Sequence, residues 1–274
     1  MKQLRLGLIG FPIQHSLSPW IHEQFLSQGH VKGSYELMET KQEDFEKQMQ
    51  AVKEKALHGF NVTVPYKETI LPYLDELDQS AANIQAVNTV ICTEGKWKGY
   101  NTDGIGYVKS LEQAYPEVTK DHSILLIGAG GAAKGIYHGL IQKGYLNITV
   151  SNRTIEKAVS FVQEPHSVID LLETEKTTEQ YDIIINTTSV GMNPNTDESI
   201  IPLQQVKPAA IVSDIVYQPI HTKFLMEAER LGANIHFGHT MLLYQAQAAF
   251  EIWTGFTPDM QGLNEQLQSI LEGR

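Results

Sequence analysis

The amino-acid sequence predicts an α/β protein of two domains, the second built on a doubly wound parallel sheet. Three observations support this fold class. The 274 residues exceed the roughly 100–200 residues usual for one domain. Short apolar runs alternate with amphipathic segments along most of the chain. A glycine-rich turn, LLIGAGGAAKG, begins only at Leu125, after almost half of the sequence.

The first hundred residues predict an α/β unit of their own. Strands are expected at 4–10, 35–39 and 59–65, and helices at 18–29 and 43–54. Ser18 is the expected N-cap of the first helix, because Pro19 follows it at the first helical position and Gly29 ends the pattern. Residues 88–103 predict a hairpin that turns near Gly95, and 104–115 the helix that leaves this domain.

The second unit repeats strand and helix with the spacing of a parallel sheet. The expected strands are 123–130, 146–152, 181–188, 209–217 and 234–238, with helices at 132–144, 155–164 and 221–232. The following helix, 241–255, is apolar over most of its circumference, so we expect it to return to the first domain, and a terminal helix to follow near 261–271. The expected domains are 1–102, with 239–274 packed back on it, and 103–238.

The glycine turn has the spacing G-x-G-x-x-A at Gly128, Gly130 and Ala133. The first glycine permits the tight turn, the second removes a Cβ where a pyrophosphate approaches, and the small third residue allows close packing of helix and strand. Such a pattern alone is weak evidence. Because a strand precedes the turn and a helix follows it, the context predicts a Rossmann-type dinucleotide site with backbone N–H groups facing the phosphates.

The end of the next strand discriminates between the two nicotinamide dinucleotides. A carboxylate there would favour NAD, whereas Asn152, Arg153, Thr154 and Lys157 offer donors and positive charge. These residues favour NADP(H). The alternative is that Arg153 and Lys157 are simply solvated residues at a helix start.

Polar residues gather at strand ends and a helix start of the first domain. They are Ser16 and Ser18 in HSLSP, Asn61, Thr63 and Lys67 in NVTVPYK, Asn88 in AVNT, and Asn101 and Asp103 in NTDG. Taken singly, each has a structural explanation as a cap, a turn former or a solvent-facing residue. Taken together, they predict one site for a small polyhydroxylated acid.

These motifs, with GAGGAAKG, NRT, NTTSVGM, DIVYQP and MLLYQAQ in the same order, resemble bacterial shikimate dehydrogenase over nearly the whole chain. The resemblance implies an NADP-dependent oxidoreductase that interconverts 3-dehydroshikimate and shikimate, a step towards chorismate and the aromatic amino acids. The implied substrate-binding residues are Ser16, Ser18, Thr63, Lys67, Asn88, Asp103, Tyr217 and Gln245. The implied cofactor-binding residues are Gly128, Ala129, Gly130, Gly131, Ala132, Asn152, Arg153, Thr154, Lys157, Thr188 and Gly238.

The chain departs from the family pattern before its last long helix. Many relatives have GLGML there, whereas this chain has His239 and Thr240 in GHTML, which puts the local backbone in question. His236 and His239 lie three residues apart, but no cysteine or carboxylate stands at ligand spacing, so we expect no metal site.

For catalysis, the cofactor carries the hydride and the protein manages the proton. Lys67, with Asp103 beside it, is the expected proton donor and acceptor. Ser16 and Ser18 are expected to hold the substrate carboxylate. The ring hydroxyls are assigned to Thr63, Asn88, Asp103 and Gln245.

Composition limits the other functions. The net charge of −11 argues against nucleic acid as a partner, and no apolar run approaches the ~18 residues of a membrane span. The N-terminus lacks the features of a secretory signal, which indicates the cytoplasm. The lone Cys92 lies in an apolar run, where a small buried side chain is expected.

The alternative functions are a quinate/shikimate dehydrogenase, a non-catalytic NADP sensor, and a dehydrogenase for a folate or another carbonyl compound. The sequence is compatible with either a monomer or a homodimer.

Overall fold

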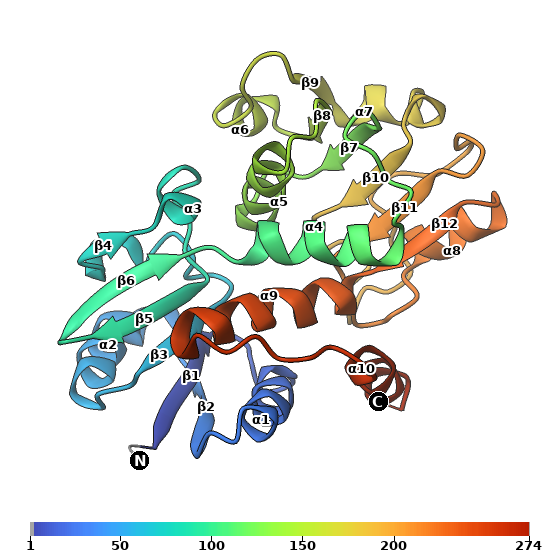
Figure 1. Ribbon diagram of the computed structural model, residues 1–274. Coiled ribbons are helices and arrows are strands. Elements are labelled where there is room, and N and C mark those ends of the chain that lie inside the picture. Colours follow the sequence, from blue (N-terminus) through green and yellow to red (C-terminus); the bar gives the residue numbers. More distant parts are fainter. Residues whose placement is uncertain (1–2, 274) are drawn as a thin grey trace. The chain divides into compact units, whose positions relative to one another are not determined.

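The computed structural model describes residues 3–273 and divides into two compact units (Figure 1). The first unit comprises Met1–Gly106 and Gln245–Asp259, and the second comprises Tyr107–Tyr244 and Met260–Arg274. The chain passes from one unit to the other three times: inside α4 (Asp103–Ala114), inside α9 (Gly238–Thr254), and between Asp259 and Met260 in the segment that follows α9.

The observed division differs from the domain limits expected from the sequence. Residues 239–274 were all expected with the first domain, but Met260–Arg274 group with the second unit. Helix α10 (Leu263–Glu272) buries one apolar stripe, Leu263, Leu267 and Leu271, and its Asn264 lies beside His239 at the start of α9. An amphipathic helix packs wherever its stripe finds a partner, and the sequence alone does not name that partner.

The first unit is a six-stranded mixed sheet with strand order β2-β1-β3-β5-β6-β4. Its strands are β1 (Leu4–Gly10), β2 (Gly33–Glu39), β3 (Gly59–Val62), β4 (Glu76–Leu77), β5 (Thr89–Thr93) and β6 (Lys96–Tyr100). Its helices are α1 (Ser18–Gln28), η1 (Gln42–Asp44), α2 (Phe45–Glu54), η2 (Leu71–Tyr73) and α3 (Gln79–Ala82). The sequence indicated neither β4 nor α3, because such short elements carry no readable period.

Pairing directions in this sheet bring the polar motifs to one edge. Strands β1 and β3 are parallel, β5 runs antiparallel to β3, and β6 runs antiparallel to β5. The carboxyl ends of β1, β3 and β6 therefore lie at the same edge as the amino end of β5. All four predicted polar segments begin or end at that edge.

The second unit is a parallel six-stranded sheet with order β12-β11-β10-β7-β8-β9. Its strands are β7 (Ser123–Ile127), β8 (Asn147–Asn152), β9 (Ser167–Asp170), β10 (Ile183–Asn186), β11 (Ile211–Asp214) and β12 (Asn234–Phe237). Besides α4, α9 and α10, this part of the chain contains α5 (Gly131–Gln142), α6 (Ile155–Val159), α7 (Leu171–Thr174), η3 (Thr178–Gln180) and α8 (Lys223–Arg230).

The strand order reverses between β7 and β10. From β7 the chain proceeds to β8 and β9 on one side, and it then returns to β10, β11 and β12 on the other. Ligands of doubly wound sheets bind in the crevice outside the carboxyl ends of the strands at this point. The glycine turn follows β7 directly, so the predicted doubly wound fold is confirmed.

Two local predictions need correction. The N-cap of α1 is Leu17, and the hydroxyl that accepts a backbone N–H at this end is that of Ser16, from Ser18 at 3.2 Å. The helix expected over 155–164 ends at Val159 as α6, and the short edge strand β9 follows it.

The second half of α9 packs on the first unit, as its apolar circumference predicted. The Phe250 ring centroid lies 5.6 Å from that of Phe25 in α1. The Trp253 indole Nε1 donates to the Val90 carbonyl at 2.9 Å. Over residues 3–273, no helix combines the length and the apolar character needed to cross a membrane.

Candidate active site

Lys67 and Asp103 form an ion pair in the first unit. The Lys67 Nζ lies 2.5 Å from Asp103 Oδ2, and the two side chains are 18% and 6% exposed. Lys67 follows β3, and Asp103 is the first residue of α4. The pairing on which the sequence-based mechanism depends is therefore present in the fold.

Asn101 explains why the Asp103 carboxylate is available to Lys67. The Asn101 Oδ1 accepts the backbone N–H of Asp103 at 3.0 Å, and its Nδ2 donates to the Ala86 carbonyl at 3.1 Å. Asn101 thus serves the backbone at the start of α4, in the manner of a capping residue. The carboxylate of Asp103 is directed to side chains instead.

Asn88 connects the segments around this pair. Its Nδ2 donates to Asp103 Oδ1 at 2.8 Å and to Thr102 Oγ1 at 3.0 Å. Its Oδ1 accepts the backbone N–H of Thr102 at 2.8 Å. Thr102, which is 2% exposed, was not among the predicted site residues, although its position between Asn101 and Asp103 was a usable signal.

Gln245 reaches the same group from α9. Its Oε1 lies 3.5 Å from Asn88 Nδ2, at the limit of hydrogen bonding. Gly106 of α4 permits this approach, because a Cβ there would lie 2.5 Å from the Gln245 backbone nitrogen. The predicted residues Lys67, Asn88, Asp103 and Gln245 therefore form one cluster.

The two predicted serines lie between β1 and α1. The Ser16 hydroxyl donates to that of Ser18 at 3.2 Å, and Ser18 is buried whereas Ser16 is half-buried. Burial raises the pKa of the Tyr35 phenol, and a hydrogen bond with Ser18 partly offsets this rise. Thr63 follows β3 and is half-buried, and its methyl group lies where a Cβ at Gly10 would stand.

The second unit holds the glycine turn in the conformation that its sequence requires. Gly128 has φ of 126°, and a Cβ there would lie 2.3 Å from Thr187 Oγ1. Thr187 in turn donates to the Ile127 carbonyl at 2.7 Å. Gly130 precedes α5 and is exposed, with nothing within 4 Å of its absent Cβ.

Helix α5 begins with small residues. Gly131 and Ala132 form its first turn and are half-buried, as is Ala129 in the preceding turn, and Ala133 is fully buried. No side chain caps this end, and no acidic residue lies in the first turn. The helix start therefore presents backbone N–H groups beside an open glycine, which fits a phosphate group.

The residues expected to select the cofactor lie at the end of β8. Asn152 Nδ2 donates to the Thr154 carbonyl at 2.8 Å and so shapes this turn. Arg153, Thr154 and Lys157 are exposed. Two cationic side chains are thus presented to solvent at the strand end where dinucleotide folds bind the adenosine ribose.

Thr188 is held by a buried network at the ends of β10 and β11. Asn186 Oδ1 accepts both the backbone N–H and the hydroxyl of Thr188, at 3.0 and 2.8 Å. Asn186 Nδ2 donates to Asp214 Oδ1 at 3.0 Å, and Thr222 donates to the other Asp214 oxygen at 2.7 Å. Burial raises the pKa of Asp214 to about 6 against these hydrogen bonds.

The remaining predicted residues, Tyr217 and Gly238, also belong to the second unit. Tyr217 is half-buried. Gly238 is buried at the start of α9, where a Cβ would lie 2.4 Å from the Ile215 carbonyl oxygen. Only glycine fits this contact, so Gly238 fixes the approach of α9 to the end of β11.

The histidines near Gly238 have structural surroundings. His236 Nδ1 lies 2.8 Å from the Ser213 hydroxyl, and its Nε2 lies 3.1 Å from that of Thr240. Thr240 also donates to the Phe237 carbonyl at 2.6 Å. Burial lowers the pKa of both His236 and His239 to about 4. Over residues 3–273, no group of three potential metal ligands is present.

The thiol of the lone cysteine has surroundings that lower its reactivity. Cys92 is half-buried in β5, and burial raises its pKa to about 12. A thiol with such a pKa is a poor nucleophile at neutral pH.

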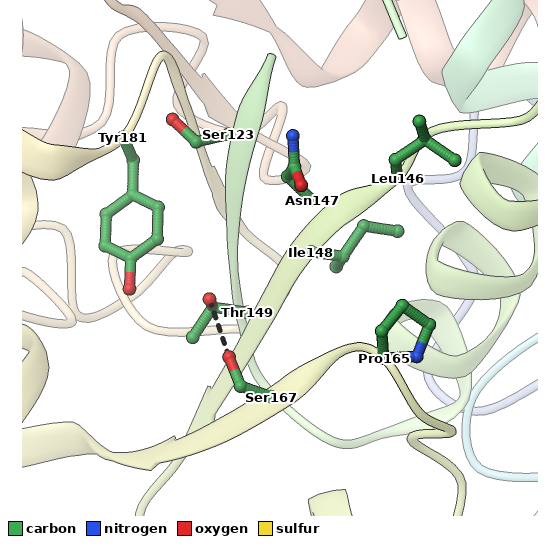
Figure 2. Close-up of a pocket in the computed structure, with 8 residues that line it drawn as sticks. All are labelled: Ser123, Leu146, Asn147, Ile148, Thr149, Pro165, Ser167 and Tyr181. Atoms are coloured by element: carbon green, nitrogen blue, oxygen red, sulfur yellow. Dashed lines mark hydrogen bonds between the residues drawn. The ribbon is translucent and has the colours of Figure 1, made fainter. Parts of the chain in front are cut away.

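A hollow with a volume of about 240 Å³ lies at the other end of the second sheet, and Figure 2 shows the residues that line it. Ser123, Asn147 and Ser167 line it at the amino ends of β7, β8 and β9. The Thr149 and Ser167 hydroxyls lie 3.0 Å apart within it. Because the glycine turn is at the carboxyl ends of these strands, this hollow is separate from the candidate nucleotide site.

The doubly wound unit with its glycine turn, together with an α/β unit that holds a buried lysine–aspartate pair, defines the class of two-domain nicotinamide-dependent dehydrogenases. Family descriptions match in three parts: "Shikimate dehydrogenase substrate binding domain" at residues 8–90, "Shikimate / quinate 5-dehydrogenase" at 110–217, and "Shikimate 5'-dehydrogenase C-terminal domain" at 238–268. The chain is 49% identical over 276 aligned residues to the shikimate dehydrogenase (NADP(+)) of Oceanobacillus iheyensis, covering 99% of each chain. It belongs to the shikimate dehydrogenase family.

Solved structures agree with this assignment. The shikimate 5-dehydrogenase of Thermus thermophilus, in complex with NADP(H) and shikimate, has a TM-score of 0.88 and 32% identity, over 97% of this chain and 99% of that one. The quinate dehydrogenase of Corynebacterium glutamicum, in complex with NAD, has a TM-score of 0.86 and 26% identity, over 99% of both chains. The fold is therefore common to enzymes that differ in substrate and cofactor.

Proposed function

We propose that this protein catalyses the reversible reduction of 3-dehydroshikimate to shikimate with NADPH, a step towards chorismate and the aromatic amino acids. The observation that carries the proposal is the Lys67–Asp103 ion pair, which is largely buried and joined to Asn88. Family membership and the 49% identity to a shikimate dehydrogenase (NADP(+)) support the substrate and the cofactor. The reaction consumes NADPH, 3-dehydroshikimate and one proton, and it yields NADP⁺ and shikimate.

The second unit fits a dinucleotide. The open Gly130, the uncapped start of α5 and the positive φ of Gly128 suit a pyrophosphate, with Ala129, Gly131 and Ala132 completing the turn. Arg153 and Lys157 supply positive charge for a 2′-phosphate, beside Asn152 and Thr154. Thr188 and Gly238 are further proposed contacts. When bound, the nicotinamide supplies the hydride.

Lys67 and Asp103 are the proposed catalytic residues. In reduction, the Lys67 ammonium donates a proton to the carbonyl oxygen of the substrate, and in oxidation Lys67 accepts the proton from the hydroxyl. The carboxylate of Asp103 orients the ammonium by the 2.5 Å contact. The pair therefore holds the proton donor in one position before the substrate arrives.

The other proposed contacts position the substrate. Ser16 and Ser18 bind its carboxylate through their hydroxyls. Thr63, Asn88, Asp103 and Gln245 bind its ring hydroxyls, and three of them already form one cluster. Tyr217 of the second unit is a further proposed substrate contact.

A spectrophotometric assay tests the proposal. Purified protein with NADPH and 3-dehydroshikimate should lose absorbance at the nicotinamide band, and shikimate with NADP⁺ should restore it. Faster turnover with quinate and NAD would reassign the protein to the quinate/shikimate type. Binding of NADPH without turnover on any of these substrates would identify a non-catalytic sensor.

The cellular location and the oligomeric state of the enzyme are also proposed. A biosynthetic dehydrogenase that depends on NADPH is proposed to work in the cytoplasm, as a monomer or a homodimer. Fractionation of cells and light scattering of the purified protein measure these two properties directly.

A further inference from the structure

A buried chain of hydrogen bonds leads from the interior of the first unit to the Lys67–Asp103 pair. Its members are Tyr35, Asn61, Thr89 and Asn88, which are 8%, 6%, 0% and 3% exposed. None of them except Asn88 has a role in the proposed function. Because these polar groups are buried, each must be satisfied within the protein, and this requirement fixes their orientations.

Two backbone groups set the direction of the chain. The Asn88 carbonyl can only accept, and it receives Asn61 Nδ2 at 3.1 Å. The side-chain oxygen of Asn61 must therefore face away, where it accepts the Tyr35 hydroxyl at 2.7 Å. The backbone N–H of Thr102 can only donate, so the Asn88 side chain must present Oδ1 to it. The two asparagine amides consequently have one orientation each.

Thr89 joins these two amides. Its hydroxyl accepts the second proton of Asn61 Nδ2 at 3.1 Å and donates its own proton to Asn88 Oδ1 at 2.9 Å, which is nearer than the other possible acceptor, Thr102 Oγ1 at 3.4 Å. With its oxygen engaged by Thr89 and Thr102, the Asn88 amide directs Nδ2 at Asp103 Oδ1, 2.8 Å away. The other carboxylate oxygen is left to Lys67.

We propose that Thr89 is a positioning residue, which acts through Asn88 to hold the Asp103 carboxylate in the orientation that receives Lys67. The side chain of Thr89 is completely buried, so the residue acts without touching the substrate. Strand pairing places it opposite both Asn61 and Tyr100, and its position is therefore set by the sheet. This inference rests on the proposed function.

The test compares Thr89→Val with Thr89→Ser. Valine keeps the shape but replaces the hydroxyl with a methyl group 2.9 Å from Asn88 Oδ1, which is too close for carbon and oxygen, so the amide must move. We expect kcat/KM for 3-dehydroshikimate to fall about tenfold, which corresponds to about 1.4 kcal/mol. The KM for NADPH should stay at the wild-type value, and Thr89→Ser should recover most of the loss.

Thr40→Val is the matched control. Thr40 is also buried in the first unit, at 3% exposure, but its hydroxyl donates to the Met38 carbonyl, outside the chain. This variant measures the general cost of losing a buried hydroxyl, and it should change the melting temperature without changing kcat/KM. Equal loss of activity in Thr40→Val and Thr89→Val would overturn the inference.

A second variant applies if Thr89→Val does not fold. Tyr35→Phe removes the hydroxyl at the far end of the chain, together with its hydrogen bond to Ser18, and keeps the ring that stacks on His22, 4.4 Å away. Ser18→Ala measures the part of any loss that arises through Ser18. We expect a loss of about two- to threefold in kcat/KM for Tyr35→Phe alone. If Thr89→Val folds, the double variant should lose less than the product of the separate losses, since residues in one network are not additive. Full activity in either single variant, or independent effects in the double variant, would refute the role of this hydrogen-bond chain in positioning Asp103.

The outcomes separate the inference from the proposed function. A wild-type protein without turnover on 3-dehydroshikimate would refute the function, and calorimetric binding of shikimate to each variant would still report on the site. An active wild type with an equally active Thr89→Val would refute only the positioning role.

Discussion

Replacement of Lys67 by alanine gives the most direct test of the catalytic assignment. In the wild type, the Lys67 ammonium lies 2.5 Å from Asp103, and both side chains are largely buried. Alanine removes the proposed proton donor, and general acid–base catalysis by a positioned side chain typically contributes 10²- to 10⁴-fold. Turnover should fall by that factor, which corresponds to about 3 to 5 kcal/mol in the activation free energy.

The fold should tolerate this change. Asp103 keeps the Asn88 donor at 2.8 Å, and its carboxylate remains in the first turn of α4, where the helix dipole favours negative charge. We expect a loss of about 1–3 kcal/mol in the free energy of unfolding. NADPH binding should be nearly intact, because the proposed cofactor residues of the glycine turn and the β8 end belong to the second unit.

The assay is the decrease in NADPH absorbance at saturating 3-dehydroshikimate, with NADPH affinity measured by fluorescence. Lys55→Ala is the matched control, because Lys55 also pairs with a carboxylate, Glu36 at 3.0 Å, but its side chain is 38% exposed and lies outside the proposed site. It should have wild-type turnover. A folded, saturated Lys67→Ala enzyme within tenfold of the wild type would remove Lys67 from the mechanism.

Three further predictions concern other parts of the molecule. Ser18→Ala should raise the KM for the substrate more than it lowers kcat, and the reverse would contradict a role in carboxylate binding. Gly128→Ala should weaken NADPH binding at least about tenfold, because φ of 126° and the contact with Thr187 exclude a Cβ; unchanged affinity by fluorescence titration would oppose this view of the turn. Burial raises the folded pKa of Asp214 to about 6 from 3.8, so the folded state holds the proton more tightly than the unfolded state. The stability that this proton contributes, up to about 3 kcal/mol, is therefore lost as pH rises from about 4 to 6. Asp214→Asn should flatten this part of the urea-unfolding profile, and an unchanged slope would show that the carboxyl pKa is not raised.

The amino-acid sequence was sufficient for most of the architecture. Apolar runs and glycine turns have local causes: Gly128 needs a positive φ, and the hairpin turn needs Glu94 and Gly95 at φ of 52° and 79°. The alternation of strands and helices predicted the parallel sheet of the second unit. The motif order also identified the residues of the proposed site, and several of these do meet in one cluster.

Other elements depended on non-local contacts. The sequence did not indicate that α10 groups with the second unit, since its apolar stripe suits many partners. The helix at 155–164 was expected from the alternation of strand and helix segments, but it ends at Val159 and the chain continues to the edge strand β9. The N-cap of α1, Leu17, likewise could not be found by a rule based on which residues favour the N-cap position.

The sequence by itself determined the two-unit α/β organisation, the glycine turn and the types of side chain available for catalysis. Tertiary structure alone decided which polar groups meet: strand directions bring Asn88 to the edge where Lys67 and Asp103 lie, and Gly106 admits Gln245 beside them. It also revealed Thr89 and Thr102 as partners of Asn88. The physical reason is that a buried amide or hydroxyl must be satisfied by neighbours that are distant in sequence, and only the folded chain defines those neighbours.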